Sequence, residues 1–402
     1  MKAEESSEEA CAEPEPRVSC VGPKKEPLRP GWLVPEAWLE RARSATREDV
    51  LRALSAASPR EAELAALLSE AAGGMLEPLA RRAEALTRSH FGRTISLYVP
   101  LYLSDYCAGG CVYCGFAGDR RVPRRRLEAA DLRSELDALK AMGFEEVLLL
   151  TGERTPQADF DYLRNAVSEA ARRFHSVLVE AFPMTTAEYR QLADAGCFGV
   201  TLYQETYDPA QYDRLHRWGP KKDYAARLEA PQRILEAGLR VAGLGALLGL
   251  ADPVSDLICL FRHARHLRRI YWRAGVTLSF PRICAQEGGY VPPHPVSERF
   301  LAQTILAFRI CLPDVPLVLS TREGPAFRDG MAGIGISKMS VASRTTVGGY
   351  RARAESADGQ FHVNDGRDVR SFCDALRRKG LEPVFKNWDA AFRGSEGGMV
   401  NG

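Results

Sequence analysis

The chain has 402 residues, 45% of them hydrophobic and 26% charged, which suits one large α/β domain with appendages. The formal net charge of +2 argues against nucleic acid as a partner, since such ligands select a concentrated basic excess. The most apolar run, residues 241–250, is broken by three glycines and is too short to cross a membrane.

The first 90 residues divide into two parts. Residues 1–30 are acidic and proline-containing, so we expect a disordered tail, and without an apolar or Arg-rich leader we expect cytoplasmic residence. Residues 31–90 carry apolar positions at helical spacing, with Gly73 and Gly74 as a stop signal, and are interpreted as a helical preface.

Strand and helix patterns then alternate along the chain. β-Branched and aromatic runs predict strands at 95–103, 146–151, 176–183, 199–206, 240–250, 276–283, 316–323 and 336–344. Amphipathic helices follow most of them, with Thr186 as a plausible cap of one helix and Pro231 as a possible break or first-turn position in another.

Eight near-continuous apolar strands between helices predict a (β/α)8 TIM-type barrel over residues 91–345, with an open doubly wound sheet as the alternative. Residues 346–402 hold one further helix pattern and are expected to pack on the barrel as a C-terminal extension. Because active sites of such barrels lie at the C-terminal ends of the strands, we expect the catalytic residues to follow the predicted strands.

Three cysteines crowd into YCAGGCVYCGF directly after the first barrel strand. Cys107, Cys111 and Cys114 have the spacing C-x3-C-x2-C, and no second cysteine or histidine pair supplies the ligands of a structural zinc site. In a reducing compartment clustered cysteines indicate metal or catalysis rather than disulfides. Three thiolates favour a 4Fe-4S cluster with one open iron, whereas three incidental cysteines are improbable at this spacing.

Polar residues end two other strands. Gly152 and Glu153 follow the second strand, where the glycine is either a plain turn residue or a point of backbone access for a ligand. Gln204 and Glu205 end the fourth strand, where buried polar side chains need partners such as a ribose or a carboxylate.

The fifth, seventh and neighbouring strands add further candidates. Gly243 and Gly245 lie within a strand, so a dinucleotide fingerprint is a weak interpretation and close approach of an adenine is preferred. Ser320 and Arg322 form a candidate clamp for an amino-acid carboxylate, although a structural pair between Arg322 and Glu323 or another acid is an open alternative. Arg282 and Ser340 are candidates of the same type.

The cysteine spacing, with the aromatic Tyr113 before the last cysteine, resembles the signature of the radical S-adenosyl-L-methionine (SAM) superfamily. The segments TGE, YQETY, GLGALLGL, SFPRI, STRE, VGGY and PVFKNWD are together similar to the tyrosine lyases of thiamine biosynthesis, the 2-iminoacetate synthases, from about residue 90 to about 390. The cluster-loop pair Gly109–Gly110 departs from the polar residues more usual in that family.

The resemblance implies that the three cysteines bind a 4Fe-4S cluster and that Tyr113, Gly152, Glu153, Gln204, Glu205, Gly243 and Gly245 contact SAM. It implies cleavage of the Cα–Cβ bond of L-tyrosine to 4-cresol and dehydroglycine, with Ser320 and Arg322 holding the tyrosine carboxylate. It also implies thiazole synthase as a protein partner and a flavodoxin- or ferredoxin-type electron donor.

Three other interpretations stay open from the sequence. A hydrogenase-maturation tyrosine lyase needs a second cysteine cluster near the C-terminus, yet beyond residue 311 this chain has only Cys373. A tryptophan lyase would use the same carboxylate clamp. A non-catalytic iron–sulfur or zinc protein would use the cysteines for stability alone.

Overall fold

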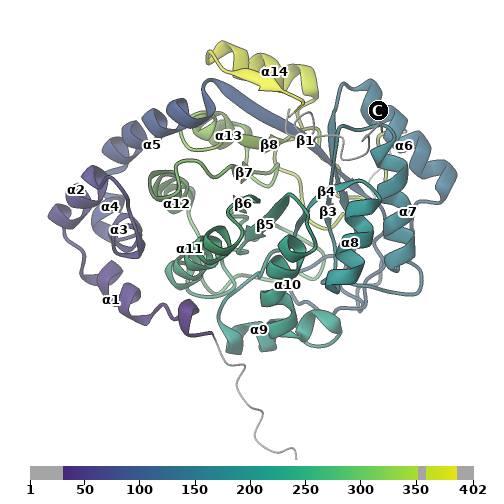
Figure 1. The fold of residues 1–402 in the computed structure, drawn as a ribbon, viewed down its shortest axis with the longest axis horizontal. Helices are drawn as coiled ribbons and strands as arrows, with labels where there is room; N and C mark the ends of the chain where they lie inside the picture. Colours follow the sequence, from purple (N-terminus) through teal and green to yellow (C-terminus); the bar gives the residue numbers. More distant parts are fainter. Residues whose placement is uncertain (1–29, 352–358, 387–402) are drawn as a thin grey trace, which may run out of the picture.

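The computed structural model describes residues 30–351 and 359–386, and its centre is a closed barrel of eight parallel strands (Figure 1). Neighbouring strands follow the chain order from β2 to β8, and β1 closes the ring by pairing with both β8 and β2. The strands are β1 (Thr94–Tyr102), β2 (Glu146–Leu150), β3 (Ser176–Glu180), β4 (Cys197–Thr201), β5 (Val241–Gly245), β6 (Gly275–Ser279), β7 (Leu317–Leu319), β8 (Lys338–Ser340) and β9 (Glu382–Val384). The barrel prediction is confirmed, and the open-sheet alternative is wrong.

Helices form an outer layer around the barrel. Those after the strands are α6 (Ala129–Ala141), α7 (Phe160–Ala171), α8 (Thr186–Asp194), α9 (Pro209–Leu215), η2 (Pro220–Lys222), α10 (Tyr224–Glu236), α11 (Pro253–Ile270), α12 (Glu298–Cys311), α13 (Pro325–Met331) and α14 (Val369–Arg378). The preface contains η1 (Gly31–Leu33), α1 (Glu36–Ser44), α2 (Arg47–Ser55), α3 (Glu61–Leu67), α4 (Glu70–Gly73) and α5 (Leu76–Phe91). Figure 1 shows the preface as one group beside α11 and α12, the helices it contacts. No helix of the described residues is long and apolar enough to cross a membrane.

Local signals explain most helix boundaries, with two corrections. The cap of α8 is Thr185, which forms a capping box with Glu188, and Thr186 is instead the first helical residue. Pro231 lies inside α10 without ending it. One turn before the proline, Arg233 Nη2 donates to the Ala226 carbonyl at 2.6 Å.

The strand that the sequence did not predict is β9. It pairs with the N-terminal part of β1, where Ser96 aligns with both Val384 of β9 and Lys338 of β8. Strand β1 therefore has β8 on one edge and β9 on the other. The edge that pairs with β9 at the start of β1 pairs with β2 at its end. Three residues are too few to show a strand periodicity in the sequence, so β9 becomes a strand only through its pairing with β1.

The domain boundaries remain predictions, although the barrel strands do fall between residues 94 and 340. The expected disordered tail, residues 1–30, lies almost wholly outside the described residues, as do residues 387–402 of the extension. Within the described part of the extension, α14 packs against β9.

One buried cation joins the base of the barrel to the preface. Arg309 of α12 is fully buried, and its guanidinium donates to the carbonyls of Gly335, Pro313 and Val315 at 2.8–3.0 Å. It also lies 4.5 Å from the ring centre of Phe91, the last residue of α5. Burial lowers the pKa of Arg309 to about 10, so the side chain stays charged at neutral pH.

We expect Arg309→Met to lower the free energy of unfolding by about 3 kcal/mol, because several buried carbonyls lose their donors. Urea denaturation followed by circular dichroism measures the change. The matched control is Arg299→Met on the same helix, whose exposed side chain donates to the Gly73 carbonyl, and it should cost less than about 1 kcal/mol. Equal effects of the two substitutions would contradict the assignment.

Candidate active site

The cysteine loop follows β1 at the C-terminal end of the barrel, and backbone donors surround its sulfurs. The amides of Gly109 and Glu153 point at the sulfur of Cys107 at 3.4 and 3.3 Å, and the amide of Phe116 points at that of Cys114 at 3.4 Å. Such N–H groups favour the thiolate form that metals bind. All three thiols are free.

The thiols of Cys107 and Cys111 need a nearby positive charge in order to ionise. Burial raises the pKa of Cys107 to about 11 and, against the effect of Lys221, the pKa of Cys111 to about 12. Bound iron would supply the charge that lets both ionise. In the part of the chain that the structure describes, no three His, Cys, Asp or Glu side chains converge closely enough to hold a single metal ion. Free thiols with amides aimed at two of the sulfurs fit a multi-iron cluster, whose irons are ligated by thiolates.

A second loop, residues 215–222, covers the cysteine loop. Cys111 and His216 form an antiparallel bridge, and the amide of Gly110 donates to the Trp218 carbonyl at 3.1 Å. A Cβ atom on Gly110 would lie 2.4 Å from the Trp218 ring, so only glycine fits there. The unusual Gly109–Gly110 pair thus has a packing explanation at its second position.

Tyr113 lies under the same loop. Its hydroxyl is 2.6 Å from Nε2 of His216, whose Nδ1 is 2.8 Å from the Tyr212 carbonyl. Burial lowers the pKa of His216 to about 2, so the ring is neutral, donates through Nδ1 and accepts the Tyr113 proton at Nε2. Contact between Tyr113 and SAM remains a prediction, and the structure shows a positioning contact to the covering loop.

The end of β2 packs directly on the cysteine loop. A Cβ atom on Gly152 would lie 2.6 Å from the Tyr106 carbonyl oxygen and 2.7 Å from Cβ of Cys107, so glycine lets the two segments meet. Glu153 is buried and accepts from Arg227 Nη1 at 3.2 Å through one oxygen. Its other oxygen, Oε2, has no hydrogen-bond partner among the described residues.

A charge network extends from Glu153 to the end of β4. Arg227 of α10 contacts Glu153 and Glu205 and also donates to the Tyr203 carbonyl at 2.7 Å. Lys221 Nζ lies 2.6 Å from Glu205 Oε1. Burial acts to raise the pKa of Glu205, yet Lys221 and Arg227 hold it below its usual value. Glu205 adopts a φ of 71°, a strained conformation that clusters at functional sites.

Two further polar atoms in this region lack partners among the described residues: Nε2 of Gln204 and Oγ1 of Thr151. Buried polar groups are normally hydrogen-bonded, so with Glu153 Oε2 they form an acceptor and donor set for a polar ligand beside the cluster loop. The amino and carboxylate groups of SAM fit this chemistry.

Gly243 and Gly245 are in close contact with protein side chains. A Cβ on Gly243 would lie 2.3 Å from Oγ1 of Thr201, and a Cβ on Gly245 would lie 2.5 Å from the Tyr203 ring. Their adenine contact stays a prediction, while the structure gives them a packing role.

A cavity occupies the C-terminal half of the barrel interior. Ser320, Arg322 and Ser340 line it from the ends of β7 and β8, and Glu180 lines it from the end of β3. The remaining lining residues are Tyr98, Pro100, Tyr102, Leu148, Leu150, Tyr203, Ser279, Pro281, Thr321, Ser343, Thr345, Gln360 and Phe361. The predicted carboxylate clamp is thus brought into one enclosed space.

Arg322 and Arg282 have different surroundings. Glu323 forms a two-point pair with Arg282, which also donates to the Val296 carbonyl at 2.8 Å, and Arg282 does not line the cavity. The alternative pairing of Arg322 with Glu323 is therefore not seen. Among the described residues the Arg322 guanidinium has no ion pair, and its Cζ lies 3.4 Å from the centre of the Phe361 ring.

Gln360 connects the cavity to the cluster loop, and no sequence pattern predicted this role. Tyr102 donates its hydroxyl to Gln360 Oε1 at 2.7 Å, and Gln360 Nε2 lies 3.8 Å from the Cys114 sulfur. Lys221, Arg227 and Gln360 escaped prediction because they come from helices and loops rather than strand ends. Glu180 could have been found as a charged residue inside the predicted strand 176–183, and it ends the observed β3.

The chain was compared with known proteins. Residues 101–258 match the radical SAM superfamily, and residues 279–382 match the biotin and thiamin synthesis associated domain. The chain is 43% identical to the 2-iminoacetate synthase of Escherichia coli K12 over 86% of its own length and 92% of that protein. The corresponding protein of Salmonella typhimurium LT2 is 42% identical over the same shares.

The chain belongs to the 2-iminoacetate synthase family. It is therefore a radical SAM enzyme, and its cofactors are a 4Fe-4S cluster and SAM. Among solved structures, the FeFe-hydrogenase maturase HydG superposes with a TM-score of 0.84 at 29% identity, over 89% of this chain and 80% of that one. Methylornithine synthase superposes with a TM-score of 0.67 at 20% identity, over 84% of this chain and 97% of that one, and shows the shared fold.

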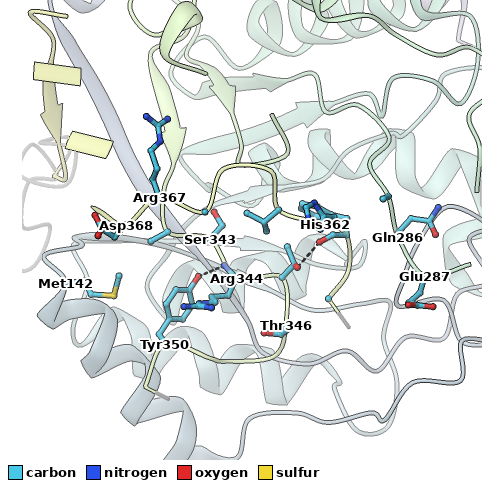
Figure 2. A pocket seen from close by; sticks show the side chains of 17 residues that line it. Met142, Gln286, Glu287, Ser343, Arg344, Thr346, Tyr350, His362, Arg367 and Asp368 are labelled. Carbon is cyan, nitrogen blue, oxygen red and sulfur yellow. Dashed lines mark hydrogen bonds between the residues drawn. The ribbon is translucent and has the colours of Figure 1, made fainter. Parts of the chain in front are cut away.

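A second, outer cavity of about 930 Å³ adjoins the inner one in this family member. The two cavities share Ser343, Thr345 and Phe361 as lining residues. Figure 2 shows Tyr350 on its wall with the hydroxyl on the Arg344 amide, 3.0 Å away. The outer cavity therefore adjoins the inner one, and Phe361, which stacks on Arg322, is part of both walls.

We expect Gly110→Ala to reduce iron and acid-labile sulfide per chain by more than about half, because the new methyl group meets the Trp218 ring and displaces the cysteine loop. Colorimetric iron and sulfide analysis after anaerobic reconstitution measures the loss. Trp218→Ala alone should keep most of the cluster, and the double variant should regain what Gly110→Ala lost. A double variant as poor as Gly110→Ala would show that the ring contact is not the cause.

Proposed function

We propose that this enzyme cleaves the Cα–Cβ bond of L-tyrosine to 4-cresol and dehydroglycine, the 2-iminoacetate used for thiazole formation in thiamine biosynthesis. The observation that carries the proposal is Arg322, a cation without a carboxylate partner among the described residues, on the wall of a cavity that Gln360 links to the cluster loop. A substrate carboxylate would form an ion pair with the Arg322 guanidinium. Identity of 43% to a protein named for this activity supports it.

Cys107, Cys111 and Cys114 would hold the cluster, and Gly152, Glu153 and Gln204 would face the methionine part of SAM. When bound, these cofactors supply a one-electron hydrogen abstraction, a chemistry that side chains lack. Lys221 and Arg227 fix Glu205 and Glu153 so that their carboxylates keep one orientation.

Ser320 and Arg322 would bind the tyrosine carboxylate, with Ser340 near the same end of the substrate. Phe361 stacks on the guanidinium and limits its rotation. A fixed carboxylate and ring leave the substrate amine as the group presented for abstraction, so the clamp selects which hydrogen reacts. The enclosed barrel keeps water from dehydroglycine, which hydrolyses readily.

We further propose thiazole synthase as the partner that receives dehydroglycine, and cytoplasmic residence beside it. A radical SAM enzyme also needs an electron donor, for which a flavodoxin or ferredoxin is suited. The outer cavity beside Phe361 supports a hand-off route, because it adjoins the inner cavity and shares three lining residues with it.

The deciding experiment is anaerobic reconstitution followed by product analysis with SAM, a reductant and L-tyrosine. We expect 4-cresol and 5′-deoxyadenosine in near-equal amounts, measured by liquid chromatography and mass spectrometry. Tryptophan in place of tyrosine should give no aryl product. Reconstituted enzyme that cleaves SAM but yields no cresol would reject the proposal, and tryptophan-dependent 5′-deoxyadenosine would favour a tryptophan lyase.

Arg322→Lys should raise KM for tyrosine by roughly 10–100-fold, because lysine keeps the charge but loses the two-point fork. Steady-state cresol formation at increasing tyrosine concentrations gives the value. Iron content equal to that of the unmodified enzyme serves as the folding control. An unchanged KM would remove Arg322 from the carboxylate site.

A further inference from the structure

The Glu180 carboxyl lies on the wall of the inner cavity, and the proposed Cα–Cβ cleavage gives it no role. Glu180 ends β3 and lines the inner cavity together with Arg322. It also lines a deeper cavity, whose one cation, Lys338, is paired with Glu146. Across residues 30–351 and 359–386 its carboxyl makes no hydrogen bond or ion pair, although a carboxyl placed inside a barrel normally has a partner.

Aromatic side chains narrow the space around Glu180. Tyr98 and Tyr203 line both of its cavities, and neither hydroxyl forms a hydrogen bond with the Glu180 carboxyl in the described residues. Tyr102 lines the inner cavity and donates its hydroxyl to Gln360. These aromatic residues therefore leave the carboxyl without a partner.

The position of Glu180 relative to Arg322 suggests the partner. In the closed strand order, β3 and β7 are four strands apart in a ring of eight and so face each other across the barrel. Arg322 follows β7, and the two groups influence each other's charge without coming within the 4.0 Å of an ion pair. A ligand with a carboxylate at one end and a hydroxyl at the other would bridge them.

Part of the cavity wall is apolar and suits a ring. Leu148 and Leu150 of β2 and Pro281 after β6 line the cavity that also holds Arg322 and Glu180. An eight-stranded barrel has room inside for one small ligand at most. An aromatic amino acid that carries a terminal hydroxyl matches a cavity with a cation, an apolar wall and an acid.

We propose that Glu180 receives the phenol hydroxyl of tyrosine opposite the carboxylate clamp, and so selects tyrosine over phenylalanine. This assignment rests on the proposed function. A site built to pair with a hydroxyl rejects the analogue without it, because the buried acid is then left unpaired.

The charges facing Glu180 are compatible with this role. Burial, with the negative charge of Glu205, raises the pKa of Glu180 to about 7, while Arg322, Lys221 and Arg227 oppose the rise. Near neutral pH the carboxyl can therefore accept the phenol proton in a hydrogen bond when ionised, or donate to the phenol oxygen when protonated.

The test measures binding without turnover. Isothermal titration calorimetry of the reconstituted enzyme, with SAM and an oxidised cluster but no reductant, compares L-tyrosine with L-phenylalanine. The unmodified enzyme should bind tyrosine at least about 10-fold more tightly. Glu180→Leu should weaken tyrosine binding by about 10–100-fold and leave phenylalanine binding unchanged or tighter. Glu180→Gln, which still hydrogen-bonds, should lie between them.

The matched control is Glu61→Gln, an acid that pairs with Arg265 between outer helices and lines neither cavity. It changes stability and should keep the tyrosine preference. Iron content and SAM affinity show whether each variant is folded. If Glu180→Leu loses iron or SAM binding, the tyrosine-to-phenylalanine ratio of Glu180→Gln decides the question. A preserved tyrosine-to-phenylalanine ratio in folded Glu180 variants overturns the assignment. If the unmodified enzyme yields no cresol, the proposed function fails instead.

Discussion

The pairing of charges inside the barrel determines what the cavity can bind. Glu323 lies next to Arg322 in the chain, yet it pairs with Arg282 across the gap between β6 and β7. Arg322 is left to stack on Phe361, on the wall of the cavity. A partly buried guanidinium without a counter-ion is available to a carboxylate ligand. The predicted clamp thus depends on a neighbouring ion pair that does not itself line the cavity.

The same logic organises the cofactor side. Arg227 and Lys221 hold Glu205 and one oxygen of Glu153, while Glu153 Oε2, Gln204 Nε2 and Thr151 Oγ1 have no partner in the described residues. Part of this polar set is therefore fixed by the protein, and the unpartnered atoms are available to a ligand. Groups that are held beforehand lose little freedom on binding, which keeps reacting atoms at a constant distance.

Close packing of glycines ties the cluster loop to both neighbours. Gly152 admits Tyr106 and Cys107, and Gly110 admits the Trp218 ring. The loop therefore lies between the end of β2 and residues 215–222 with no space for a Cβ at either contact. The cysteine loop, the end of β2 and residues 215–222 therefore hold one another in place. We expect a change in any of the three to move the cysteine sulfurs.

The sequence alone determined the eight strands, the barrel and the three-cysteine loop, because hydrophobic period and ligand spacing are local properties. It also placed Ser320 and Arg322 at a strand end. It could not distinguish Arg282 from Arg322, or Thr185 from Thr186, since each choice depends on which partner lies nearby in space. Only the tertiary structure brought Glu180 opposite Arg322 and Gln360 beside Cys114, because ring closure joins residues that are far apart in the chain. Spatial pairing of charges, which no local pattern encodes, decided which of the candidate residues are available to a ligand.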